Sequence, residues 1–400
     1  MDSSKPVLIL GLGITGKSFI NFFNTLKKPF ITFDTRVKEQ SFHLEEYQKF
    51  NMVSEDEINL NNIDFIACSP GFDLTHKLIK TAIEKKIDIK SDIQIFLEKN
   101  KSKAILITGT NGKSTVCSWL ELIFLKKNID SLAIGNIGKP VLDFIETEKD
   151  FFILEVSSFH LDISELPESE VAVLLNITPD HLDRHKDFES YVKVKNKILK
   201  KSKISIANEK FKELITKSDY FFEGDGSSKN QNLNAVKKIF SSLKINYSEK
   251  EILSCYPQLP HRMEEFHILE NGISFIDDSK ATNISSSLEG LKNIELSKKI
   301  IVICGGETKN QNFEKFCHYL NNRAEYIYFL GESSEFLKQH LDANKSKQVK
   351  NLEVAVSYAL SKIKKDTILI LSPGCSSLDM FSSFSERGNK FKELVLNAEL

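Results

Sequence analysis

The stretch from Lys103 to Leu120 constrains the fold of this chain more than any other part of the sequence. Its apolar run, Ala104 to Ile107, is typical of a buried strand, and a helix-like segment that ends in Trp119 and Leu120 follows the turn. The turn itself reads Thr-Gly-Thr-Asn-Gly-Lys-Ser-Thr. A strand, a glycine turn and a helix start that carry a lysine and a hydroxyl have the layout of a phosphate-binding loop. The sequence therefore predicts a nucleoside triphosphate site.

In such a loop, backbone N–H groups and the helix N-terminus attract phosphate, the lysine adds a positive charge, and a hydroxyl can bind Mg²⁺. Ile107 stands where the usual pattern has its first glycine, so this is a variant loop. The simpler alternative is a lysine in an ordinary turn before a helix. The candidate nucleotide-binding residues of the loop are Gly109, Thr110, Asn111, Gly112, Lys113, Ser114 and Thr115.

Length and composition limit the class of protein. A chain of 400 residues exceeds what one hydrophobic core usually serves, so we expect two or three domains. The net charge of −1 gives no general electrostatic reason to bind nucleic acid or an anionic membrane. The six cysteines lack zinc or C-x-x-C spacing and indicate reduced thiols. With no targeting segment or membrane-spanning run in view, we expect a soluble cytoplasmic protein.

The first domain, expected over residues 1–91, resembles a nucleotide-binding βαβ unit. A buried strand from Val7 to Leu10 leads into a glycine turn, a helix from Lys17 to Leu26 and a second strand that ends at Asp34. An acid ~20 residues beyond the glycines belongs to the dinucleotide fingerprint. This signal alone predicts a phosphorylated ligand, and an NAD-dependent dehydrogenase is one alternative. A third strand ends at Ser69-Pro70-Gly71.

In the central domain, expected over residues 92–260, two more apolar strands end in polar residues. One runs into Glu155 and the other into a segment that contains His181. Ligand sites of open α/β sheets lie beyond the carboxyl ends of the strands, and Mg²⁺ prefers carboxylates. Glu155 is therefore a candidate magnesium ligand, with an exposed strand-end acid as the alternative. His181 is either a metal ligand or part of an interdomain or capping network.

Two helices of this domain are also predicted. The lysine-rich helix from Tyr191 to Lys203 would, on sequence physics alone, present a charged face to solvent. Residues 205–255 are less informative: we expect one strand, a polar loop and a helix from about Asn232.

The third domain, expected over residues 261–400, is another parallel α/β unit. Its predicted strands are 272–276, 300–304, 326–330 and 367–371, and polar or glycine-containing turns follow them. The overall prediction is an α/β protein with a Rossmann-like N-terminal domain, a central P-loop ATPase-like domain with a mostly parallel sheet, and a Rossmann-like C-terminal domain.

The loop Thr-Gly-Thr-Asn-Gly-Lys-Ser-Thr resembles the ATP site of the Mur ligases and the folylpolyglutamate synthases. Three further motifs resemble the D-glutamate-adding members of the Mur ligase family: Ser69-Pro70-Gly71, Asp278 to Asn283, and the terminal stretch from Ser372 to Phe391. The resemblance implies a cytoplasmic, monomeric ligase that uses ATP and two Mg²⁺ ions. Such an enzyme adds D-glutamate to UDP-N-acetylmuramoyl-L-alanine through an acyl phosphate, in peptidoglycan precursor synthesis.

The resemblance also implies roles for individual residues. The catalytic residues would be Lys113, Glu155, His181 and Lys195, and magnesium would be held by Ser114, Glu155, His181 and Lys195 as a carbamate. Beside the loop, ATP would contact Asn234 and Arg262. The UDP substrate would contact Ile14, Thr15, Asp34, Thr35, Arg36, Ser69, Gly71 and Asn136. The D-glutamate site would be formed by Lys280, Thr282, Lys309, Ser377, Leu378 and Phe384.

The sequence departs from the family pattern at two places. His160 stands where glutamine often follows E-x-S-S-F, and only Asn234 matches cleanly the family's H-N-x-x-N element. Two alternatives remain beside the dehydrogenase. One is a non-catalytic nucleotide-binding protein, and the other is a sister ligase that adds a different amino acid. The third-domain motifs, and the lack of a D-N-P-R stretch, disfavour the sister ligase.

Overall fold

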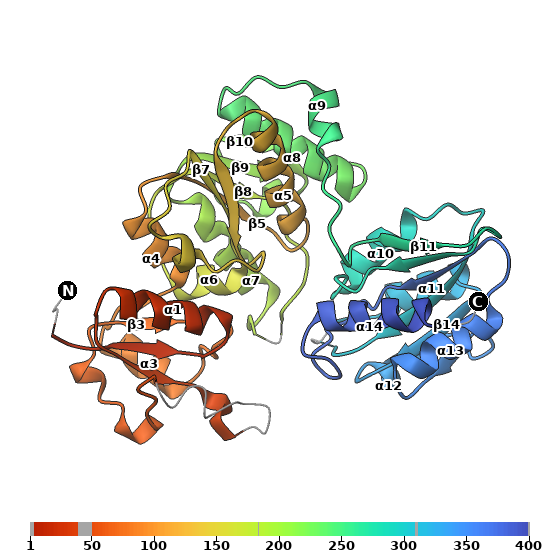
Figure 1. Ribbon diagram of the computed structural model, residues 1–400, viewed down its shortest axis with the longest axis horizontal. Coiled ribbons are helices and arrows are strands. Elements are labelled where there is room, and N and C mark those ends of the chain that lie inside the picture. The colour runs from red at the N-terminus through yellow and green to blue at the C-terminus, as the bar shows by residue number, and fades with distance from the viewer. Residues whose placement is uncertain (1–3, 39–49, 183, 309–310, 399–400) are drawn as a thin grey trace. The chain divides into compact units, whose positions relative to one another are not determined.

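The computed structural model describes residues 4–38, 50–182, 184–308 and 311–398 (Figure 1). The chain divides into two compact units, and each is described by itself. The first comprises residues up to Ile177 together with Glu189–Tyr256, and the second comprises Thr178–Phe188 together with residues from Pro257 onward. The first unit contains two sheets and the second contains one.

The N-terminal sheet of the first unit is parallel, with the order β2-β1-β3-β4. Its strands are β1 (Val7–Leu10), β2 (Phe30–Phe33), β3 (Ile66–Cys68) and β4 (Ile89–Lys90), and its helices are α1 (Ile14–Thr25) and α3 (Lys77–Glu84). Helix α1 begins before the expected Lys17, so Ile14 and Thr15 lie in its first turn. A side chain at Gly16 would come within 2.2 Å of the Gly11 carbonyl oxygen, so this close helix–strand contact requires glycine.

The second sheet of this unit is also parallel, with the order β10-β9-β8-β5-β7-β6. Its strands are β5 (Lys103–Thr108), β6 (Ser131–Gly135), β7 (Phe151–Glu155), β8 (Ser169–Leu174), β9 (Ser202–Asn208) and β10 (Tyr220–Phe222). Strand β5 lies between β7 and β8, so the phosphate-type loop is flanked by the residues that end those two strands. Sequence reasoning did not predict the short strand β10.

Helices cover both faces of this sheet (Figure 1). Helices α5 (Lys113–Lys126) and α8 (Ser228–Ser242) share one buried core against it. On the other side, Phe96 of α4 (Asp92–Lys99) packs edge-on against Phe152, with ring centroids 5.0 Å apart. The remaining helices are α6 (Ser158–Ile163), α7 (Phe188–Asn196) and α9 (Glu249–Ser254). Helix α8 begins at Ser228, capped by Ser227, rather than near the expected Asn232.

The sheet of the second unit has the order β11-β12-β16-β13-β14-β15. Its strands are β11 (Glu264–Ile268), β12 (Ser274–Asp277), β13 (Lys299–Gly305), β14 (Tyr326–Leu330), β15 (Ser346–Gln348) and β16 (Thr367–Leu371). Only β11 is antiparallel to its neighbour among these described strands. Sequence reasoning missed both edge strands: none of the residues of β11 is fully buried, and β15 has only three residues, which are also partly or fully exposed.

Alternation along β13 explains the two layers of helices around this sheet. Ile300 and Val302 pack into the core with α11 (Glu314–Arg323) and α12 (Ser334–His340). Ile301 and Ile303 point to the opposite face, toward α13 (Leu352–Lys362) and α14 (Phe384–Leu396). Helix α10 (Ile284–Lys292) follows β12. The predicted α/β class with mostly parallel sheets is confirmed.

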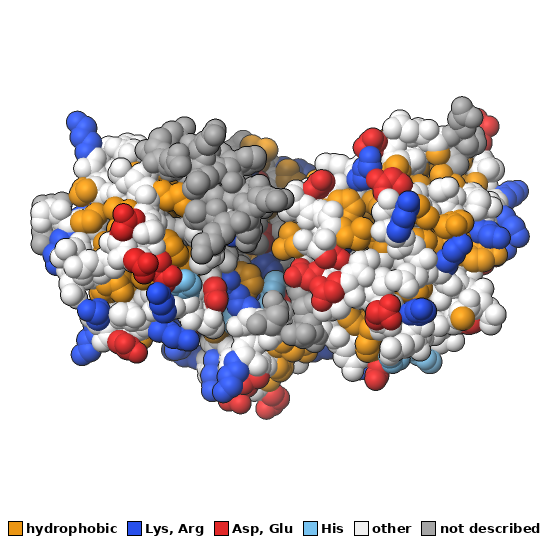
Figure 2. Space-filling model, turned by 90° about the horizontal axis from the view of Figure 1, so that it is seen from below, with side chains coloured by type: hydrophobic (Ala, Val, Ile, Leu, Met, Phe, Trp, Pro, Cys, Tyr) orange, Lys and Arg blue, Asp and Glu red, His pale blue; other side chains and the backbone are white. Residues whose placement is uncertain are grey.

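The described surface shows mixed character. On the face drawn in Figure 2, acidic and basic side chains are interspersed with apolar ones, in keeping with the net charge of −1. Among the described residues, no helix is both long and apolar enough to cross a membrane.

The single tryptophan gives a test of the packing around α5. Trp119 is fully buried, and its Nε1 donates a hydrogen bond of 2.7 Å to the Ile252 carbonyl oxygen. We predict that Trp119→Phe, which removes one of the two hydrogen bonds to that buried carbonyl and leaves the one from the Cys255 N–H, lowers the free energy of unfolding by about 0.5–1.5 kcal/mol. Trp119→Ala, which also opens a cavity, should lower it by about 3–5 kcal/mol.

Urea unfolding followed by circular dichroism measures these changes. Leu125→Ala is the matched control, since Leu125 lies on the same helix but is 70% exposed. The control should stay within about 0.5 kcal/mol of the wild type. A Trp119→Ala variant as stable as this control would contradict the packing described here.

Candidate functional site

The loop between β5 and α5 is shaped for an anion. Gly112 has a positive φ of 86° and precedes Lys113, the first residue of α5. The Lys113 ammonium donates hydrogen bonds of 2.9 Å to the carbonyl oxygens of Gly109 and Thr110. Lys113 is thus folded over its own loop, at the N-terminus of a helix of 14 residues. A helix N-terminus and an adjacent ammonium both favour negative charge.

Asn176, two residues beyond the end of β8, holds this loop in place. Its Nδ2 donates to the Asn111 carbonyl oxygen at 3.0 Å, and its Oδ1 accepts from the Asn111 N–H at 2.9 Å. The Asn176 carbonyl oxygen also accepts a hydrogen bond from the Thr110 N–H at 3.0 Å. Sequence reasoning gave Asn176 no role, although its place at a strand end, as for Glu155, is a signal that could have identified it.

Glu155 ends β7 beside the loop and is only 2% exposed. The alternative of an exposed strand-end acid is therefore wrong. Its Oε1 accepts a hydrogen bond of 2.9 Å from Nδ2 of Asn136, another candidate residue. Its Oε2 is buried and has no hydrogen-bond partner among the described residues. A buried carboxylate oxygen is costly unless it is paired, so this atom fits the binding of a cation.

Lys195 lies on α7 and is only 1% exposed, so the prediction of a solvent-facing lysine is wrong for this residue. Its ammonium donates a hydrogen bond of 2.9 Å to the Gly109 carbonyl oxygen and lies 4.8 Å from the ring centroid of Tyr191. The Tyr191 hydroxyl is 3.1 Å from the Thr110 hydroxyl. One turn of α7 therefore contacts the phosphate-type loop twice.

The oxygen donors around the loop include the Glu155 carboxylate and the hydroxyls of Ser114 and Thr115, in the first turn of α5. Hard oxygen donors beside a phosphate site suit Mg²⁺.

A second group of possible metal ligands, His261, Glu264 and Asp277, lies elsewhere, in the other unit. There the Lys392 ammonium is 2.5 Å from Glu264 and 3.6 Å from Asp277, so a cation already neutralises the carboxylates.

Helix α8 presents Asn232 to the loop, a residue that sequence reasoning did not single out. A side chain at Gly112 would come within 2.6 Å of Oδ1 of Asn232, which is buried. Asn234 instead donates a hydrogen bond of 3.1 Å to the Glu223 carbonyl oxygen. Sequence reasoning missed Asn232 because it relied on spacing within the motif, whereas the direction of the helix decides which side chain meets the loop.

The glycine turn of the first sheet is organised by Asp34, which is 2% exposed. Its carboxylate accepts hydrogen bonds from the Leu12 N–H at 2.6 Å and from the backbone and side chain of Arg36 at 2.7–3.0 Å. Burial acts to raise the pKa of Asp34, but the hydrogen bonds from Arg36 and Leu12 outweigh it and lower that pKa. Because its oxygens are occupied in this way, Asp34 is poorly placed to bind a dinucleotide ribose.

The other candidates of this pocket lie around the same turn. The Ser69 hydroxyl donates to the Gly11 carbonyl oxygen at 2.7 Å. Ile14 is 72% exposed at the open N-terminus of α1, which no side chain caps. Thr15 is half-buried in the same turn, and Thr35, Arg36 and Gly71 are exposed.

In the second unit, several candidate residues gather beyond the ends of β12 and β16. The Lys280 ammonium lies 3.8 Å from the ring centroid of Phe384. Ser377 is buried, Thr282 is half-buried, and Leu378 is 65% exposed. Asp278, two residues before Lys280, is buried, and this burial raises its pKa to about 7. Lys309 lies outside the described residues.

His181 belongs to the segment that clusters with the second unit. The backbone N–H of His181 donates a hydrogen bond of 2.9 Å to Oδ1 of Asp180. Oδ2 of Asp180 accepts a hydrogen bond of 3.0 Å from Nδ2 of Asn283. Asn283 is the N-cap residue of α10, so the structure places His181 beside a capping network. This was one of the alternatives that the sequence predicted for His181. Arg262 follows His261 and is half-buried.

Comparisons with known proteins identify three consecutive family domains. Residues 5–91 match the Mur ligase MurD-like N-terminal domain, residues 107–252 the Mur ligase middle domain, and residues 261–375 the Mur ligase glutamate ligase domain. The chain is 35% identical to the UDP-N-acetylmuramoylalanine–D-glutamate ligase of Buchnera aphidicola from Schizaphis graminum, over 98% of this chain and 97% of that protein. It is 30% identical to the ligase of the same name from Francisella philomiragia, over 98% of both.

Solved structures support the fold. The chain resembles the UDP-N-acetylmuramate–alanine ligase MurC of Thermotoga maritima with a TM-score of 0.61 and 15% identity, over 98% of this chain and 99% of that one. It resembles MurF of the same organism, solved in complex with ADP, with a TM-score of 0.61 and 15% identity, over 99% and 97% of the two chains. The three matched domains and the full-length relatives together show that the chain belongs to the Mur ligase family.

Proposed function

We propose that this protein is an ATP-dependent ligase that adds D-glutamate to UDP-N-acetylmuramoyl-L-alanine. One observation carries the proposal: relatives at 30–35% identity over 98% of the chain are named as ligases of this activity. The geometry supports it, because a phosphate-type loop, a buried acid with an unpaired oxygen and a buried lysine lie together at one sheet edge. The proposed setting is cytoplasmic peptidoglycan precursor synthesis, with the enzyme acting as a monomer.

In this proposal, each domain binds one of the three reactants. Residues 1–91 bind the UDP end of the substrate, with Arg36 and the N-terminus of α1 toward the phosphates. Residues 92–260 bind ATP, with further contacts from Asn234 and Arg262. Residues 261–400 bind D-glutamate through Lys280, Ser377, Phe384 and their neighbours.

The first chemical step forms an acyl phosphate. A carboxylate oxygen of the substrate's terminal alanine attacks the γ-phosphorus of ATP, and the bond to the β-phosphate oxygen breaks, which releases ADP. Lys113 moves from its loop carbonyls to the transferring phosphate and stabilises the negative charge that develops there. Asn176 keeps the loop N–H groups aimed at the phosphates while this happens.

Magnesium ions held by Ser114, Glu155, His181 and Lys195 as a carbamate would neutralise phosphate charge during this step. Asn136 orients the Glu155 carboxylate by its hydrogen bond to Oε1. Carbamylation, in which the neutral Lys195 amine adds to CO₂ and loses a proton, would turn this cation into an oxygen donor. The one N–H left on Nζ could still donate to the Gly109 carbonyl oxygen.

The second step forms the amide. The neutral amine of D-glutamate attacks the acyl carbon, a tetrahedral intermediate forms, and phosphate leaves with the oxygen that had bridged carbon and phosphorus. The amine loses a proton in the same step. Because acyl phosphates hydrolyse readily, the three domains must exclude water once this intermediate has formed.

The first prediction concerns substrate dependence. Purified protein with ATP, Mg²⁺ and UDP-N-acetylmuramoyl-L-alanine should release ADP and phosphate steadily only when D-glutamate is added. L-Glutamate and L-alanine are the controls and should give a small fraction of that rate. Activity with L-glutamate but not with D-glutamate would refute the proposed function. Nicotinamide cofactor binding without ATP binding would favour a dehydrogenase.

The second prediction concerns Lys195. Lys195→Ala should lower kcat by roughly 100-fold or more, because an oxygen donor near the transferring phosphate is lost. Short carboxylates such as acetate should restore part of the rate by standing in for the carbamate. Lys193→Ala on the same helix is the control. Lys193 is exposed, and among the described residues its ion pair is with Glu189, which is also exposed. Unchanged activity of Lys195→Ala would remove this lysine from the site.

A further inference from the structure

The arginine of the terminal motif, Arg387 on α14, has no role in the proposed chemistry, yet it is one of the most enclosed charged residues described. It is only 4% exposed. Its Nε donates to the Ser279 hydroxyl at 3.0 Å, and its Nη2 donates to the carbonyl oxygens of Ser279 at 2.9 Å and Cys375 at 3.1 Å. Its Nη1 donates to the Ser376 carbonyl oxygen at 3.2 Å.

These acceptors lie on two loops that carry proposed D-glutamate contacts. Ser279 immediately precedes Lys280, and Ser376 immediately precedes Ser377. The Ser279 hydroxyl, in turn, donates a hydrogen bond of 2.8 Å to the Phe384 carbonyl oxygen. The Arg387 guanidinium therefore fixes the distance between the two loops and, through Ser279, their distance from Phe384.

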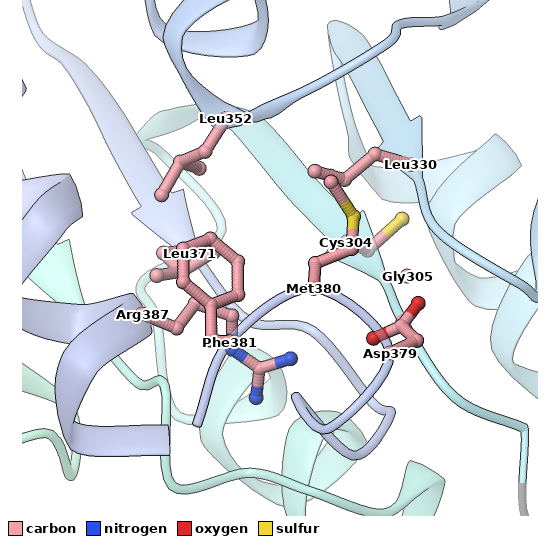
Figure 3. Close-up of a pocket in the computed structure, with 10 residues that line it drawn as sticks. Cys304, Gly305, Leu330, Leu352, Leu371, Asp379, Met380, Phe381 and Arg387 are labelled. Carbon is pink, nitrogen blue, oxygen red and sulfur yellow. The ribbon is translucent and has the colours of Figure 1, made fainter. Parts of the chain in front are cut away.

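The charge of Arg387 is not neutralised by an ion pair among the described residues, since its hydrogen bonds go to carbonyl oxygens and a hydroxyl. Burial lowers its pKa to about 10, although nearby groups that include Asp379 and Asp278 act to raise it, so it stays a cation at neutral pH. Figure 3 shows its side chain beside Phe381 and Leu371, in the apolar lining of a small pocket that also includes Asp379. Charges interact more strongly in such surroundings than in water.

We propose that Arg387 is a positioning residue for the amino-acid substrate, and that its buried cation favours a substrate with an anionic side chain over a neutral one. This inference rests on the proposed function and deepens it. The guanidinium holds the loops of Lys280 and Ser377 at the spacing that a dicarboxylate needs, and its charge adds to that of the Lys280 ammonium. A lysine keeps the charge but lacks the planar set of donors that reaches both loops.

The test compares Arg387→Met and Arg387→Lys with the wild type in the full chain. The KM of D-glutamate should rise roughly 10- to 100-fold in both variants, because hydrogen bonds from a charged group are lost. The KM values of ATP and the UDP substrate should change little. The ratio of kcat/KM for D-glutamate to that for D-glutamine should fall in Arg387→Met and be largely retained in Arg387→Lys. A purely structural role would not produce this difference.

Two further variants make the test decisive. Ser279→Ala removes only the hydroxyl between Arg387 and Phe384, and it should also raise the KM of D-glutamate. It takes the place of Arg387→Met in the test if that variant does not fold. Arg323→Met is the control, because Arg323 donates to the exposed Glu295 carbonyl oxygen away from these loops.

The outcomes separate the two proposals. If the wild type turns over without needing D-glutamate, the proposed function fails before any variant is measured. The role of Arg387 is overturned by a different result, in which the wild type does need D-glutamate. In that case Arg387→Lys, Ser279→Ala and any folded Arg387→Met all show the wild-type KM for D-glutamate and the wild-type preference for D-glutamate over D-glutamine.

Discussion

The hydrogen bonds between Asn176 and the backbone of Asn111 are the interaction on which the nucleotide site depends. They tie the end of β8 to the loop that follows β5, which lies next to it in the sheet. The acid that ends β7 lies on the other side of the same loop. A parallel sheet brings the carboxyl ends of its strands to one edge, so three distant parts of the sequence form a single anion site.

Much of this arrangement can be predicted from the sequence, because strands followed by polar turns have a clear pattern. The loop, Glu155 and the α/β class follow from apolar runs and glycine positions. The burial of Lys195 does not, since a lysine in a lysine-rich helix looks solvated until its partner, the Gly109 carbonyl oxygen, is known. Asn176 and Asn232 were missed for a similar reason: strand order and helix direction decide what they touch, and neither can be read from local spacing.

Prediction from the sequence was least successful for the edge strands and for the segment around His181, which packs with a different unit from the one expected. Few residues of the strands β10, β11 and β15 are buried, so their apolar pattern is faint. His181 was expected to act with the central domain, yet its segment packs with the second unit through Asp180 and Asn283. The third domain contains polar contacts of buried groups, of which those of Arg387 are the clearest.

The central claim is that the carboxylate of the substrate is activated by phosphate transfer at the loop that holds Lys113. UDP-N-acetylmuramoyl-L-alanine with ¹⁸O in its terminal carboxylate tests this most directly, when the products formed with D-glutamate are weighed by mass spectrometry. An acyl phosphate requires one ¹⁸O atom to appear in the released inorganic phosphate and the other to stay in the new amide. Released phosphate without ¹⁸O, or ¹⁸O in an adenine nucleotide product, would contradict the account.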